Sequence, residues 1–127
     1  MWILGCGYIG QRLARTYLDQ GYPVTAVTRS EASRLALAVS GIRALARDLT
    51  TDSLDDLGWG GEDLFHLAPP PPVGVEDRLT RHLVASFRHA GHPRRLVYMS
   101  TTGVYGDCGG DWVDETRPPA PATDRSR

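Results

Sequence analysis

Three glycines near the start of the chain stand at a spacing that can bind phosphate. The chain opens MWILGCGYIGQRLARTYLDQG, in which GCGYIG matches the pattern G-x-G-x-x-G. In dinucleotide-binding proteins the first glycine permits a sharp turn, the second lets a pyrophosphate approach, and the third lets helix and sheet pack closely. Free amides and the positive end of the helix dipole then face the phosphates. The candidate pyrophosphate residues are Gly5, Gly7, Tyr8, Ile9 and Gly10.

A motif of this kind also occurs as a tight turn without a ligand, so its neighbours decide between the two. Residues 1–4 are a short apolar run that stops at glycine, which is typical of a buried strand. Residues 9–20 place apolar side chains at helical spacing and stop at Gly21, which predicts a helix. The glycines therefore follow a strand and open a helix, and this context favours nucleotide binding.

The end of the second predicted strand, Pro23–Thr28, indicates which dinucleotide binds. In NAD-binding proteins a carboxylate about 20 residues after the glycines holds the ribose 2′-hydroxyl. Here Thr28 is followed by Arg29 and Ser30, and no acid is present. Arg29 can pair with the 2′-phosphate of NADP, and Ser30 can donate to it. Alternatively, Arg29 is a solvated loop residue and Ser30 only the N-cap of the next helix, although Ser30 can do both. NADP is favoured over NAD.

The rest of the chain alternates between strand and helix patterns. The expected helices cover Ser30–Ser40, with Leu35 and Val39 inward, Thr51–Leu57, and Val75–Ala90, with Leu79, Leu83, Val84 and Phe87 on one face; the expected strands cover Ile42–Ala46, Asp63–Ala68 and Arg95–Met99. Short connections between such elements predict an α/β fold with a doubly wound parallel sheet of order 3-2-1-4-5. Its ligand crevice is expected beside strand 1, at the carboxyl ends of the strands.

Composition narrows the classes of function. The chain has 127 residues and a formal net charge of −1, which suits one domain and argues against a nucleic-acid or anionic-membrane binder. Cys6 and Cys108 make no disulfide framework, so a cytoplasmic location is expected, with Cys6 a small filler in the glycine turn. His66 is expected to be packed or bonded to backbone. The other histidines lack metal-ligand spacing, so no metal site is predicted.

Beyond these patterns, the chain resembles the extended short-chain dehydrogenase/reductase family of NAD(P)-dependent epimerases, dehydratases and reductases. The segments that carry the resemblance are GCGYIG, the Asp48-Leu49 pair, HLA at the end of the fourth strand, STTGVYGD and DWVDETRPPAP, in family order along nearly the whole chain. The resemblance implies that Asp48 and Leu49 contact adenine and that Ala68 lines the nicotinamide side. It also implies that the hydroxyl of Thr101 hydrogen-bonds the reacting oxygen of the substrate.

The sequence departs from the family pattern in two ways. The family uses a tyrosine, with a lysine four residues later, as its general acid/base. The tyrosine position falls near Arg125, and all 14 basic residues are arginine, so the pair is missing. This resembles a divergent branch that keeps the fold and cofactor site without the pair. The chain also stops where the family continues with a long helix and a substrate lobe, so it is expected to be the amino-terminal part of a longer protein.

Together these features predict one NAD(P)-binding Rossmann domain over residues 1–127, in which residues 107–127 are an irregular loop. The expected function is that of an NADP(H)-dependent oxidoreductase of epimerase/dehydratase type, which transfers hydride to or from a small, sugar-like substrate. A protein that senses NADP(H) without turnover is the alternative. A methyltransferase that uses S-adenosylmethionine is a remote one, because that class needs an acid after strand 2. A homodimer is expected only by analogy.

Overall fold

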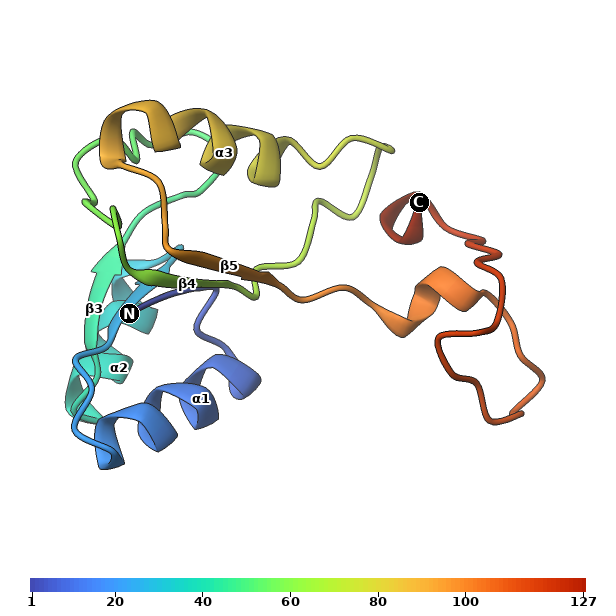
Figure 1. Cartoon of the computed structure of the whole chain (residues 1–127), viewed down its shortest axis with the longest axis horizontal. Coiled ribbons are helices and arrows are strands. Elements are labelled where there is room, and N and C mark those ends of the chain that lie inside the picture. Colours follow the sequence, from blue (N-terminus) through green and yellow to red (C-terminus); the bar gives the residue numbers. More distant parts are fainter.

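The strands form one parallel sheet in the predicted order, β3-β2-β1-β4-β5 (Figure 1). The computed structural model describes the backbone of residues 1–127 and every side chain except that of Arg125. The strands are β1 (Trp2–Leu4), β2 (Thr25–Thr28), β3 (Arg43–Ala46), β4 (Asp63–His66) and β5 (Arg95–Tyr98). The helices are α1 (Tyr8–Asp19), α2 (Glu31–Val39) and α3 (Arg78–Ala90), with 3₁₀ turns at Thr102–Tyr105 and Asp124–Ser126.

Alternate residues of the strands face two separate cores. Ile3 of β1 lies beside Ala26 of β2 and packs with it under α1 and α2. Leu4 lies beside Val27 and packs with it under α3. Figure 1 shows α1 and α3 on opposite sides of the sheet. Helices on both faces are what a doubly wound parallel sheet requires, because both of its faces are apolar.

Two of the three helices begin at a side-chain cap. Ser30 accepts a hydrogen bond from the amide of Ser33 at 3.2 Å at the start of α2. Asp77 accepts one from the amide of Thr80 at 3.0 Å at the start of α3. The N-cap residue of α1 is Gly7, which has no side chain to accept a hydrogen bond. The first amides of a helix have no partner within the helix. Of the three helices, α1 is therefore the one whose N-terminus has no side-chain cap.

The helix predicted over Thr51–Leu57 is not formed. This segment is a series of turns that bury Leu54 and Leu57 against the α3 side of the sheet. The amide of Asp48 donates to the carboxylate of Asp52 at 2.7 Å. The amide of Asp55 donates to the Ser53 hydroxyl at 3.3 Å. Short polar side chains that bond nearby backbone compete with helical bonding, and here they prevail.

The predicted inward face of α2 is also wrong. Leu37 is buried, whereas Leu35 is 52% exposed and Val39 is 91% exposed. Residues two positions apart on an α-helix lie about 200° apart, so a helix that buries Leu37 must expose both of its apolar neighbours. Leu37 packs with Ile42 in the core under α1 and α2. On α3, Val84 is 49% exposed, while the other three predicted inward residues are buried.

The chain beyond Gly106 extends away from the sheet and is irregular apart from its last 3₁₀ turn (Figure 1). It folds back on the segment that follows β5, because the amide of Ala120 donates to the carbonyl of Val104 at 2.9 Å. Within the described residues, no helix combines the length and apolar character needed to cross a bilayer.

Candidate functional site

The three glycines of the turn have different surroundings. Gly5 has a φ of +81°, and a Cβ there would lie 2.5 Å from the amide nitrogen of Ala68. At Gly10 a Cβ would lie 3.2 Å from the carbonyl oxygen of Gly5. At Gly7 a Cβ would meet nothing within 4 Å. Gly5 and Gly10 are thus needed for packing, whereas Gly7 leaves open space beside the backbone.

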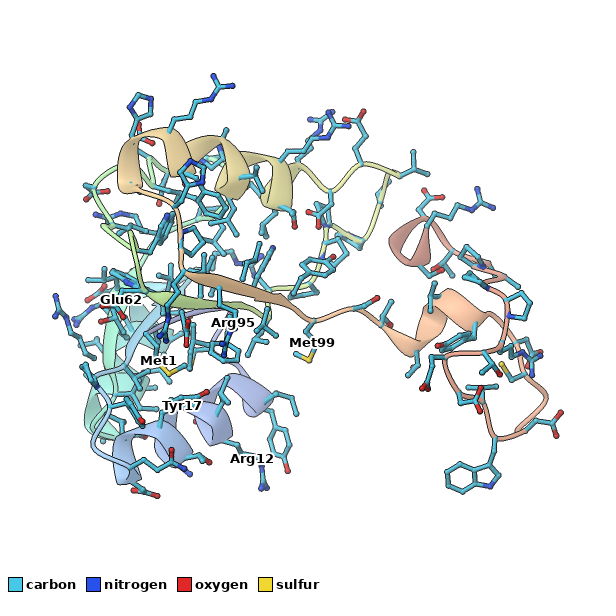
Figure 2. All side chains as sticks on the ribbon, in the orientation of Figure 1. Met1, Arg12, Tyr17, Glu62, Arg95 and Met99 are labelled. Carbon is cyan, nitrogen blue, oxygen red and sulfur yellow. The ribbon has the colours of Figure 1, made fainter. Side chains whose placement is uncertain are left out.

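The first turn of α1 faces solvent at the carboxyl end of β1. Tyr8 is 71% exposed and Ile9 is 50% exposed. The guanidinium of Arg12 lies 4.5 Å from the centre of the Tyr8 ring, a cation–π contact on the outer side of the helix. In Figure 2, Arg12 points away from the sheet, whereas Tyr17 lies between α1 and the sheet. The uncapped amides of this turn are therefore accessible to an anion.

An arginine follows β2 where a carboxylate would read an NAD ribose. Arg29 is exposed, and among the described side chains no carboxylate lies within ion-pair distance of it. Ser30 serves as the cap of α2, and its hydroxyl donates to the hydroxyl of Ser33 at 2.9 Å. The helix cap and the predicted ligand contact therefore fall on the same side chain.

At the end of β3, Asp48 is held as an anion. Hydrogen bonds from the side chain and the amide of Thr50 lower the pKa of Asp48, and the positive charge of Arg29 lowers it further. The charge of Arg29 is thus felt at Asp48, on the neighbouring strand end. Leu49 is 7% exposed and packs into the core under α3.

The ends of β4 and β5 enclose a hollow of about 400 Å³. Its walls include Leu67, Pro69, Pro70, Tyr98, Thr101 and Val104, and Ser126 and Arg127 close one side. The hydroxyl oxygen of Thr101 accepts a hydrogen bond from the amide of Gly103 at 3.2 Å, so its own hydrogen stays free for another acceptor. Met99 directly follows β5, at the point where the chain leaves the sheet (Figure 2). A more open hollow of about 550 Å³ around Trp112 contains none of the predicted site residues.

The predicted site residues therefore lie along one edge of the sheet, at the carboxyl ends of its strands. Gly5 and Ala68 are in contact, and Arg29 and Asp48 lie on neighbouring strand ends. Thr101 follows β5, with β1 and β4 between it and Arg29. The side chain of Arg125, at the position expected for the family tyrosine, lies outside the described residues. In the part of the chain that the structure describes, no three metal-ligating side chains cluster.

Two further residues of the site region have perturbed acidity. Burial raises the pKa of the Cys6 thiol to about 11, which keeps it protonated and unreactive. His66 is fully buried, as predicted, but its Nε2 lies 2.8 Å from the Thr80 hydroxyl rather than bonded to backbone. Burial lowers the pKa of His66, and the charge of Asp77 opposes that shift. An aspartate three residues before a threonine at a helix start signals the Asp77 cap, but no local pattern signals the contact with His66.

A parallel sheet in this order, with a glycine turn that leaves a helix N-terminus open, defines a Rossmann-type nucleotide-binding domain. A Synechocystis protein that bears the name of a dihydroflavonol 4-reductase is 32% identical over 88% of this chain and 35% of its own length. An NAD-dependent epimerase/dehydratase structure from Methylobacillus flagellatus matches with a TM-score of 0.77 and 26% identity, over 98% of this chain and 45% of the other. A conserved Silicibacter pomeroyi protein of unknown function matches with a TM-score of 0.73 and 31% identity, over 98% of this chain and 43% of the other.

These similarities confirm the predicted resemblance to the extended short-chain dehydrogenase/reductase family. It spans about a third of the curated relative and less than half of these solved structures. No protein-family model matches it. The fold is shared with a Thermus thermophilus UDP-glucose 4-epimerase solved in complex with NAD, at 23% identity and a TM-score of 0.73.

Proposed function

We propose that this chain binds NADP(H) and forms the cofactor-binding part of an oxidoreductase. The observation that carries the choice of NADP(H) is Arg29, an exposed guanidinium without an ion-pair partner among the described side chains. A 2′-phosphate would supply the missing anion through two parallel hydrogen bonds. NAD in the crystal structures of related folds supports a nicotinamide nucleotide as the cofactor.

The remaining predicted residues fit such a ligand along the strand ends. The open side of Gly7 and the uncapped first turn of α1 suit the pyrophosphate. The ionised carboxylate of Asp48 can accept from the amino group of adenine, with the backbone of Leu49 beside it. The chain at Ala68 borders the turn on the nicotinamide side.

Bound NADP(H) would supply or accept a hydride at the hollow that Thr101 lines. The free hydroxyl hydrogen of Thr101 can donate to an oxygen of a small, sugar-like substrate and orient it. The position expected for the family tyrosine falls near Arg125, so these residues supply no tyrosine for a tyrosine/lysine pair. This departure favours the second candidate, a protein that binds NADP(H) without turnover.

The test is a fluorescence titration of the chain with NADPH and with NADH, for the wild type and Arg29→Ala. We expect tighter binding of NADPH, and loss of that preference in the variant by about tenfold or more, since a charge-assisted pair contributes about 1.5–3 kcal/mol. Arg43→Ala is the matched control, because Arg43 begins β3 at the opposite edge of the sheet. Equal affinity for both nucleotides in the wild type would refute the assignment of Arg29.

A further inference from the structure

The loop between β4 and α3, residues 67–76, is closed at its base by hydrogen bonds between the residues that flank it. His66 is the last residue of β4, and Asp77 is the N-cap of α3. The Thr80 hydroxyl donates to Asp77 Oδ2 at 2.6 Å and lies 2.8 Å from His66 Nε2. Thr80 thus links the two ends of the loop.

The next strand adds a third anchor. Tyr98 of β5 is the register partner of His66, and the two rings meet edge to face with their centres 5.2 Å apart. The Tyr98 hydroxyl donates to Asp77 Oδ2 at 3.3 Å. The Asp77 carboxylate is therefore linked to β5 directly through Tyr98, and to β4 through Thr80 and His66.

The groups present determine which atom donates and which accepts in each hydrogen bond of this network. The Thr80 hydroxyl gives its one hydrogen to Asp77, so its oxygen accepts from the Nε2–H of His66. Nδ1 of His66 is buried without a hydrogen-bond partner, and burial lowers the pKa of His66. The neutral ring with its proton on Nε2 is therefore the favoured form.

The loop has few hydrogen bonds of its own to fix it. Pro69 to Pro72 have no amide hydrogens, so they cannot donate backbone hydrogen bonds. Pro69 and Pro70 nevertheless form part of the wall of the hollow that Thr101 lines. At its far end, the amide of Gly74 donates to the Asp124 carboxylate at 3.2 Å. The position of this wall therefore depends on how firmly the base of the loop is held.

We propose that His66, Asp77, Thr80 and Tyr98 form a base clasp that positions the β4–α3 loop as a wall of the hollow beside Thr101. None of the four is a catalytic residue in this proposal; they act through the loop. The consequence for nucleotide affinity rests on the proposed function, whereas the consequence for the loop does not.

Hydrogen exchange of Leu67 and Gly74, the loop residues whose amides donate hydrogen bonds, tests the clasp without any ligand. Thr80→Val removes the bridging hydroxyl but keeps the backbone amide that Asp77 caps. We expect exchange about tenfold faster in the loop, the effect of losing about 1.4 kcal/mol of local stability, and recovery in Thr80→Ser. Thr16→Val is the control, because Thr16 bonds only within α1, to the carbonyl of Arg12. Unchanged loop exchange in Thr80→Val would overturn the proposal.

A second variant and a second measurement separate the possible failures. If Thr80→Val does not fold, Tyr98→Phe decides, because it keeps the ring and removes one donor; we expect loop exchange about twofold to fivefold faster. NADPH affinity should fall in Thr80→Val while the ratio of NADPH to NADH affinity stays at its wild-type value, because Arg29 lies beyond β1 and β4. A wild type that binds no nucleotide but shows the exchange effect would refute the proposed function and support the clasp. A wild type that binds NADPH, with unchanged loop exchange in Thr80→Val, would support the proposed function and refute the clasp.

Discussion

Gly7 and Gly10 belong to the same motif, yet the space around them predicts that an added methyl group weakens nucleotide binding at Gly7 and destabilises the fold at Gly10. Gly7→Ala places the methyl in open space at a backbone conformation with φ of −80°, so stability should change by less than about 0.5 kcal/mol. The same methyl stands where the pyrophosphate would approach, and NADPH affinity should fall about tenfold. Gly10→Ala pushes against Gly5, Ile3 and Cys6 and should cost about 1–3 kcal/mol.

Thermal unfolding and NADPH titration of both variants separate the two effects. A Gly7→Ala protein as destabilised as Gly10→Ala would show that the open side of Gly7 is needed for the fold. Full NADPH affinity in a stable Gly7→Ala protein would show that the phosphates lie elsewhere.

At this scale the sequence predicted where the candidate residues lie along the sheet better than what each one touches. The glycine spacing and the place of Arg29 after the second strand are local features of the sequence, so they could be found without the structure. The approach of Ala68 to Gly5 joins residues far apart in sequence, and no local pattern encodes it. The same holds for His66, whose partners come from α3 and β5.

The start of α3 should be more sensitive to its cap than the start of α2. Asp77 accepts from the amide and the hydroxyl of Thr80 and from Tyr98, whereas the exposed cap Ser30 bonds only Ser33. Asp77→Ala should therefore lower the free energy of unfolding by about 2 kcal/mol or more, and Ser30→Ala by about 0.5–1 kcal/mol. Urea unfolding of both variants provides the measurement. Equal losses would mean that the contacts beyond the cap add nothing to stability.

Elements were predicted well in order and type, and less well in the faces that they bury. Strand and helix patterns alternate clearly, so the topology follows from the rules of parallel sheets. The buried face of α2 depends on which side the sheet offers, and the unbroken apolar run from Leu35 to Val39 does not specify it. Residues 51–57 have leucines three positions apart, as in a helix, but their aspartate and serine side chains bond nearby backbone instead.

For the molecule as a whole, the buried histidine predicts a loss of stability in weak acid. The pKa of His66 is lowered in the folded protein by burial, so the unfolded chain takes up a proton first as the pH falls. Stability from this group is complete above about pH 6.5, the usual pKa of histidine, and decreases below it toward the folded pKa.

Urea unfolding between pH 3 and pH 8, compared for the wild type and His66→Asn, measures this dependence. The variant should be less stable at pH 8 and lose less on acidification, since asparagine does not titrate. His89→Asn, which removes an exposed histidine near the end of α3, should keep the wild-type slope. Asp77 acts at lower pH: burial raises its pKa, but the hydrogen bonds from Thr80 and Tyr98 outweigh this and leave it lowered. Its contribution is lost only below about pH 4, so a slope confined to that range would assign the acid sensitivity to Asp77 and not to His66.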